Sequence, residues 1–196
     1  MAKITAEISL EEKEIKEKSQ SMLLWISMAS MVMIFIALTS AVIVRKADGN
    51  WLDFELPFKF YISTAVILLS SITMLWATNS AKVNNFENIK KGLLATLALG
   101  IIFIYLQFSA WGDLVDAGIF FAGPSSNASG SFMYVLTWAH LMHLVGGIIG
   151  LLITYYKATK QKYDAVNMGG LKLCSTYWHF LDILWVYLLL FLLFIR

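Results

Sequence analysis

The segment Thr176–Leu190 reads TYWHFLDILWVYLLL, in which a histidine and an aspartate stand three residues apart in a largely apolar run. The segment contains no lysine or arginine that would neutralise the carboxylate. The apolar run spans residues 173–195, and a helix needs roughly 20 residues to cross the hydrocarbon of a bilayer. A charged side chain at that depth is costly unless it faces other helices. This segment therefore predicts a membrane helix that packs inside a bundle.

The composition extends this prediction to the whole chain. Of the 196 residues, 59% are hydrophobic and 14% are charged, and the mean hydropathy is +0.70. Such a chain is too apolar for a soluble domain and too long for a single membrane anchor. Because backbone groups in lipid need internal hydrogen bonds, the apolar runs are expected to be helices. We predict an all-α membrane protein, a bundle of five transmembrane helices at residues 21–44, 58–79, 92–111, 131–156 and 173–195.

The basic residues predict how the bundle lies in the membrane. Eleven lysines lie in the N-terminal segment and in the two loops on its side, whereas four basic residues lie on the other side. Basic residues beside membrane helices favour the cytoplasm, so we expect the N-terminus there and the C-terminus outside. The basic residues form short clusters between apolar runs, which indicates topology signals and no nucleic-acid partner.

The first twenty residues form a separate, charged segment. They mix lysine with glutamate, which does not fit the basic start of a cleavable signal peptide. Ser9 and Glu12 match a capping box, so we expect a short amphipathic helix over residues 9–20 that lies on the membrane. Residues 21–196 are expected to form one transmembrane domain.

All three histidines and one aspartate lie inside predicted spans. His140 and His143 share one side of the fourth span, and His179 and Asp182 share one side of the fifth. At 1.5 Å per residue, His140 and His179 differ by about 15 Å in depth, which is too far for one shared ion. His143 and Asp182 differ by about 6 Å, so we expect Asp182 to lie near His143.

Three interpretations of these four residues remain open. They act as buried polar residues that hold helices together, as members of a proton relay, or as ligands of a metal or haem. Gln107, near the outer end of the third span, fits a helix contact. We group all five as buried packing or proton-handling residues, and the sequence contains no recognisable catalytic constellation.

Further residues indicate helix and lipid contacts. Gly146 and Gly147 follow His143 and lower the helix profile, so that a neighbouring helix or a lipid can approach closely. Trp138 lies near the end of a span, as expected of the aromatic belt at a membrane interface. Cys174 is the single cysteine, which excludes an intrachain disulfide and a thiolate-rich metal site.

The motifs of the last two spans resemble those of a known family. WAHLMHLVGG (residues 138–147) and YWHFLDILWVYLLLF (residues 177–191) are similar to the last two helices of subunit III of the haem-copper oxidases. YLQFS (residues 105–109) resembles the third core helix, and the resemblance covers residues 20–196. Five spans resemble the short bacterial form. The most specific motif consists of Tyr177, Trp178, His179, Phe180, Asp182 and Trp185.

The chain departs from the family at two places. Members often have a glutamate where this sequence has Ala110, and many have a buried glutamate in the span that matches residues 21–44, which contains none. A role of those two carboxylates in lipid binding or proton uptake therefore does not carry over to this chain.

The resemblance implies an accessory subunit of the cytochrome c oxidase type in a bacterial plasma membrane. It implies no catalytic, metal-binding or cofactor-binding residue in this chain. It implies direct contact with subunit I, which carries haem and copper and reduces oxygen to water, in a complex with subunit II and further respiratory subunits. It also implies bound structural phospholipid and support of sustained turnover and proton uptake. Helix or lipid contacts are expected at Trp138, Gly146, Gly147, Trp178 and Trp185. The electron donor, cytochrome c or quinol, is left open.

Two alternative functions remain. The first is a haem b membrane anchor of a quinone-linked enzyme, with His140 or His143 as axial ligand. The second is a small proton-coupled transporter, which inverted repeats with broken helices would favour, and the sequence contains no such repeat.

Overall fold

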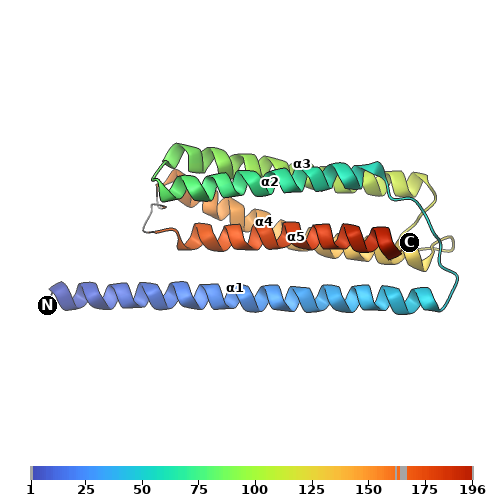
Figure 1. Ribbon diagram of the computed structural model, residues 1–196, viewed down its shortest axis with the longest axis horizontal. Helices are drawn as coiled ribbons and strands as arrows, with labels where there is room; N and C mark the ends of the chain where they lie inside the picture. Colours follow the sequence, from blue (N-terminus) through green and yellow to red (C-terminus); the bar gives the residue numbers. More distant parts are fainter. Residues whose placement is uncertain (1, 162, 164–166, 196) are drawn as a thin grey trace.

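The computed structural model describes residues 2–161, 163 and 167–195, with side chains at residue 11 and from residue 15 onward. These residues form a helical bundle with no strand among them (Figure 1). Its five helices confirm the predicted all-α class, and each predicted span lies inside one of them. The helices are α1 (Ala2–Ala47), α2 (Phe58–Lys82), α3 (Phe86–Asp116), α4 (Ala128–Thr159) and α5 (Gly169–Ile195).

Four of the helices form a closed ring. α2 packs on α3, α3 on α4, α4 on α5, and α5 again on α2, while α1 packs on the outside of the ring against α4 and α5 (Figure 1). α2 and α3 share the most extensive contact. At Gly92 of α3 an added Cβ would lie 2.8 Å from the Cβ of Ala77 on α2, so this contact depends on a residue without a side chain.

Helix α1 differs from the prediction for the N-terminal segment. It runs without a break from Ala2 to Ala47, so Ser9 lies inside the helix and not at its start. The expected contact between Ser9 and Glu12 lies outside the described side chains. The physical reason for the continuity is that lysine and glutamate are good helix formers and the range contains no glycine or proline. Figure 1 shows the N-terminal end of α1 projecting beyond the other four helices.

Local signals in the sequence account for the helix ends. α2 begins at Phe58, directly after Pro57, whose fixed φ suits a helix start. The Asn85 side chain accepts a hydrogen bond from the backbone N–H of Asn88 at 3.1 Å, and so caps α3. Asn127 accepts one from the N–H of Ser129 at 3.0 Å and caps α4.

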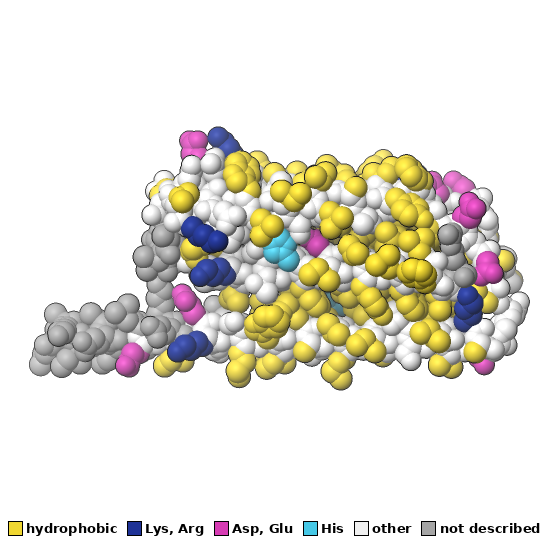
Figure 2. Space-filling view, viewed as in Figure 1, with side chains coloured by type: hydrophobic (Ala, Val, Ile, Leu, Met, Phe, Trp, Pro, Cys, Tyr) yellow, Lys and Arg dark blue, Asp and Glu magenta, His cyan; other side chains and the backbone are white. Residues whose placement is uncertain are grey.

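The surface of the bundle matches a lipid environment. Figure 2 shows mostly apolar side chains over the middle of the visible face, together with a histidine and one acidic side chain, while the other charged side chains gather toward the two ends. All five helices are long and apolar enough to cross a membrane. Five such helices, with most charged side chains of the visible face near the ends, make the chain a multi-pass membrane protein.

Candidate functional site

The motif of α5 faces hydrogen-bonding side chains on α2. The indole N–H of Trp178 donates to Oγ of Ser70 at 2.9 Å, and that of Trp185 donates to Oγ1 of Thr64 at 2.9 Å. Both tryptophans are fully buried, and pairing their N–H groups removes the cost of a buried donor without a partner. We call this contact the polar seam, defined by Thr64, Ser70, Ser71, Trp178, His179, Asp182 and Trp185.

The centre of the polar seam contains three residues that share one hydroxyl group. Oγ of Ser71 lies 2.7 Å from Nδ1 of His179 and donates to Oδ2 of Asp182 at 2.5 Å. Asp182 is only 2% exposed, whereas Ser71 and His179 are half-buried. Nε2 of His179 and Oδ1 of Asp182 are buried and have no hydrogen-bond partner within the described residues. The carboxylate therefore relies on a neutral hydroxyl for its hydrogen bond.

The hydroxyl residues of α2 are the part of the site that the sequence analysis missed. Thr64, Ser71 and Thr78 follow one another at intervals of seven residues, as Trp178 and Trp185 do on α5. Residues seven apart lie on the same face of a helix, so both patterns mark contact faces. The recurrence of Ser or Thr at every seventh residue of the second span is the sequence signal that could have identified these hydroxyl residues.

His140 lies in an aromatic cluster away from the centre of the seam. Its ring centroid is 5.2 Å from that of Trp185 and 6.1 Å from that of Phe103. Trp185 also meets Phe103 edge-on at 5.0 Å and stacks on Phe60 at 5.9 Å, so α2, α3, α4 and α5 all contribute to this cluster. Neither ring nitrogen of His140 has a hydrogen-bond partner among the described residues.

The contacts of the His143 ring lie on its own helix and on α1, and they do not include Asp182. Nδ1 of His143 lies 2.7 Å from the backbone oxygen of Ala139, and its ring packs against Phe35 of α1 at 5.7 Å. The hydrogen-bond partner of Asp182 is Ser71 instead. The depth estimate gave the height of each residue along its helix but not its direction around the axis, which decides which helix it meets.

The two histidines of α4 also turn to different neighbours. Residues three apart on a helix differ by about 60° around the axis. His140 therefore meets α3 and α5 through Phe103 and Trp185, while His143 meets α1 through Phe35. The two histidines lie on one broad side of α4, as the spacing predicts, but this side faces α3 and α5 at His140 and α1 at His143.

Gln107 forms a contact between helices. It is 1% exposed, and its Nε2 donates to Oγ of Ser63 on α2 at 3.0 Å. Its Oε1 is buried without a partner among the described residues. Ser63 stands seven residues before Ser70, which donates to the backbone oxygen of Ile67 and accepts from Trp178.

Gly146 and Gly147 lie on the side of α4 that faces α5, whereas Trp138 packs against α3. At Gly147 an added Cβ would lie 2.9 Å from Cδ1 of Leu181, and at Gly146 it would lie 3.8 Å from the hydroxyl of Tyr177. Gly147 is buried and Gly146 is exposed. Trp138 is 51% exposed and packs beside Trp111 with 5.7 Å between ring centroids.

The described residues show no cluster of metal ligands around the histidines. Among the described residues, no three His, Cys, Asp or Glu side chains lie close enough to hold a metal ion. The ring of His140 packs against those of Phe103 and Trp185.

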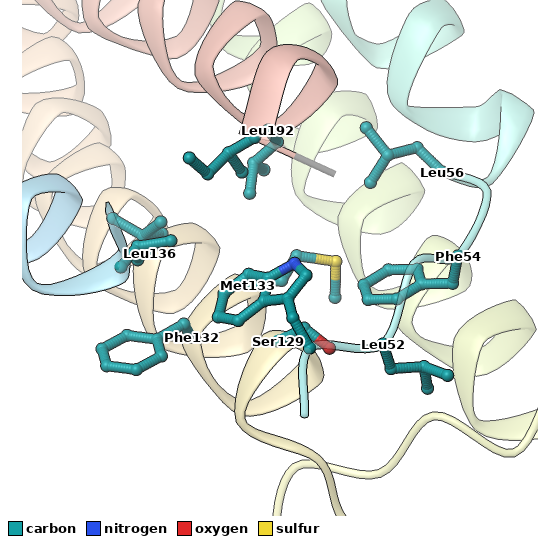
Figure 3. Close-up of a pocket in the computed structure, with 11 residues that line it drawn as sticks. Leu52, Phe54, Leu56, Ser129, Phe132, Met133, Leu136 and Leu192 are labelled. Atoms are coloured by element: carbon teal, nitrogen blue, oxygen red, sulfur yellow. The ribbon is translucent and has the colours of Figure 1, made fainter. Parts of the chain in front are cut away.

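A small void lies at the opposite end of the bundle from the N-terminus of α1. It has a volume of about 20 Å³ and lies beneath the segment that connects α1 to α2. Figure 3 shows Leu52, Phe54 and Leu56 of this segment on one side and Phe132, Met133 and Leu136 of α4 on the other. None of its lining residues is ionisable, so the void is a packing defect with room for about one water and not a reaction site.

Comparison with known proteins places the sequence in a family. The family model described as cytochrome c oxidase subunit III matches residues 22–195. A protein of Nocardia farcinica named probable cytochrome c oxidase subunit 3 is 30% identical over 179 residues, which cover 89% of this chain and 86% of that protein.

Animal relatives match a shorter part of the sequence. Cytochrome c oxidase subunit 3 of Equus caballus is 28% identical over 65% of this chain, and that of Artemia franciscana is 31% identical over 66%. The matches span 46% and 48% of these relatives, so the chain aligns with about half the length of the animal proteins. The family match covers every helix of the ring and most of α1. The chain belongs to the cytochrome c oxidase subunit III family.

Proposed function

We propose that this chain is the accessory subunit III of a terminal oxidase of the cytochrome c type in a bacterial plasma membrane. In this role it packs against catalytic subunit I, in a complex with subunit II, while haem and copper reside in those partners. The observation that carries the proposal is the family match over residues 22–195, which includes the whole polar seam. The chemistry of the seam supports it, since its residues hold helices together and none is placed as a redox ligand.

Purification of the complex tests the proposal. A tagged chain expressed in its native membrane is expected to bring down a large subunit that contains haem and copper. An optical spectrum of the separated chain distinguishes the alternative. Bis-histidine haem bands in the separated chain, with no large partner recovered, would overturn the proposal in favour of a haem b anchor.

We also propose that the N-terminus lies in the cytoplasm and the C-terminus outside. The support is the distribution of basic residues, eleven against four, on the two sides of the spans. Reporter fusions to the loop at residues 83–85 and to the connection at residues 117–127 test it. A cytoplasmic reporter is expected to be active at the first site and inactive at the second, and the reverse result contradicts the orientation.

Lipid binding is supported by a groove between α1 and α5. The groove has a volume of about 300 Å³, and Glu17, Lys18, Lys172 and Trp25 are among the residues that line it. Two ammonium groups against one carboxylate, beside an indole, suit a phosphate head group at a membrane interface. Native mass spectrometry of the full chain is expected to retain phospholipid in the wild type and to lose it when both lysines are changed to glutamine.

A further inference from the structure

The centre of the polar seam forms a chain of three polar groups. Nε2 of His179 at one end and Oδ1 of Asp182 at the other have no hydrogen-bond partner in the described part of the chain. Between them, Oγ of Ser71 lies 2.7 Å from Nδ1 of His179 and 2.5 Å from Oδ2 of Asp182. Both distances are short enough for a proton to pass along an existing hydrogen bond.

With a neutral His179, the single hydrogen of the Ser71 hydroxyl allows two arrangements of the chain. When Asp182 is ionised, Ser71 donates to Oδ2, so Nδ1 of His179 carries a hydrogen and donates to Ser71, and Nε2 is bare. When Asp182 is protonated, its O–H donates to Ser71, Ser71 donates to Nδ1, and Nε2 carries the hydrogen. The two arrangements differ by one proton and by the direction of both hydrogen bonds.

We propose that Ser71, His179 and Asp182 form a proton-binding site in which a proton taken up at Nε2 of His179 is held as the carboxylic acid of Asp182. An N–H bond forms at Nε2 while the N–H bond at Nδ1 breaks. That second proton forms a new O–H bond on Ser71, whose original O–H bond breaks as an O–H bond forms at Oδ2 of Asp182. The charge of the three residues changes from −1 to zero, and no electron moves.

The surroundings favour neutralisation of the carboxylate by a proton. α5 is contacted by α1, α2 and α4. α1 has no ionisable residue between Lys18 and Arg45, and α2 has only Tyr61 between Lys59 and Lys82. A buried carboxylate without a cation is stabilised when it binds a proton.

The remaining titratable groups near α5 have other neighbours. On α4, His140 packs against Trp185 and His143 bonds to Ala139. On α5 itself, the hydroxyl of Tyr177 donates to the backbone oxygen of His143, and that of Tyr187 pairs with Thr39 of α1. The proton equilibrium is therefore set mainly by the three residues of the site.

This inference deepens the proposed support of proton uptake and rests on the proposed function for its use in the oxidase. The site itself is a property of this chain. A test on the full chain alone therefore separates the two claims, because co-purification with an oxidase tests the function and titration of the chain tests the site.

The test follows the two ends of the site at once in lipid nanodiscs. Infrared spectroscopy reports the carbonyl stretch of a protonated Asp182, identified by its loss in Asp182→Asn. Nitrogen NMR of labelled histidine reports which ring nitrogen of His179 carries the hydrogen. As pH rises, the carboxylic acid band and the Nε2–H tautomer are expected to disappear at the same midpoint, because one proton governs both.

Substitutions on α2 test the part played by the hydroxyl. Ser71→Ala is expected to separate the two midpoints, and Ser71→Thr to keep them together. Ser70→Ala is the matched control, because it removes a neighbouring hydrogen bond between α2 and α5, the one from Trp178, and leaves the site intact. In Ser70→Ala the midpoints of the Asp182 and His179 titrations are expected to coincide, as in the wild type.

Several results overturn the proposal. The proposal fails if the tautomer of His179 does not change while Asp182 titrates. It also fails if Asp182 keeps one protonation state over the whole pH range in which the chain stays folded. Coincident midpoints in Ser71→Ala also overturn it. If Ser71→Ala does not fold, the wild type and Ser71→Thr decide, since both retain the hydroxyl.

Discussion

At the scale of single residues, Trp185 of the polar seam contacts side chains from three other helices. Its ring meets Phe60, Phe103 and His140, and its N–H donates to Thr64. These contacts connect α5 to three other helices. In lipid, where apolar surface gains little from burial between helices, such dense packing is the main stabilising term.

Removal of this side chain should therefore destabilise the whole ring. We expect Trp185→Ala to lower the free energy of unfolding by about 3–5 kcal/mol, the usual cost of emptying a large buried site. Thermal unfolding of the full chain in nanodiscs, followed by circular dichroism, measures it. Trp138→Ala is the control, because that indole is 51% exposed, and an equal loss in both variants would contradict the central role of Trp185.

The hydrogen bond of Trp185 can be tested apart from its packing. Thr64→Val keeps the shape of the side chain but leaves the buried indole N–H without an acceptor. We expect a loss of about 1–3 kcal/mol, measured by the same unfolding experiment. Thr159→Val, on the exposed last turn of α4, should leave the unfolding temperature nearly unchanged. A neutral Thr64→Val would show that the N–H finds another partner.

The residue scale also shows how far sequence reasoning reaches into the site. His179 and Asp182 were predicted to be buried together because ionisable residues in a membrane span face other helices. Their partner Ser71 was not predicted, since serine is neutral and common in membrane helices. The direction in which a side chain points around its helix depends on contacts between helices, and the spacing of residues within one helix does not determine it.

At the scale of helices, the contact between α2 and α3 depends on Gly92. An added Cβ there would lie 2.8 Å from the Cβ of Ala77 and 3.1 Å from its backbone nitrogen and Cα, so the helices would have to separate. We expect Gly92→Ala to cost about 1–3 kcal/mol, the range for an overpacked core, measured as a lower unfolding temperature.

A second glycine supplies the matched control. At Gly150 on α4 an added Cβ meets nothing within 4 Å. Gly150→Ala should be neutral or slightly stabilising, because alanine favours the helix by about 1 kcal/mol over glycine. If Gly92→Ala and Gly150→Ala changed the unfolding temperature by the same amount, the close approach of α2 to α3 would not explain the glycine at position 92.

The five spans were predictable, but the extent of α1 was not. Apolar runs of about 20 residues identify membrane helices well because the bilayer leaves the backbone no other fold. The bilayer places no such constraint on the charged N-terminal segment. Only its helix propensity and its lack of glycine and proline indicate that it continues α1. The capping-box pattern at Ser9 was a weaker signal than that continuity.

At the scale of the whole molecule, α1 is the least connected helix. It packs against α4 and α5 but, among the described residues, not against α2 or α3. Its contacts include Phe35 against His143 and the hydrogen bond between Thr39 and Tyr187 at 3.1 Å. The ring of four helices closes without it, so we expect α1 to separate first.

Loss of the Phe35 side chain should loosen α1 while the ring stays closed. Phe35 is 1% exposed, and nitroxide labels at Met33 and Ile183 report the distance from α1 to α5 in a chain with Cys174→Ala. Pulsed electron spin resonance is expected to show a broader distance distribution in Phe35→Ala. Labels at Leu69 and Ile149, on α2 and α4, should give the wild-type distribution. Equal broadening in both pairs would mean that α1 belongs to the same cooperative unit as the ring.

The unbroken course of α1 gives the molecule a mechanical property. Its 46 residues form a rod of about 69 Å, more than twice the roughly 30 Å of the hydrocarbon layer. A helix without glycine or proline has no joint at which it can bend freely. A partner protein that binds the N-terminal end and displaces it sideways would therefore tilt the whole of α1 relative to α4 and α5, the two helices on which α1 packs.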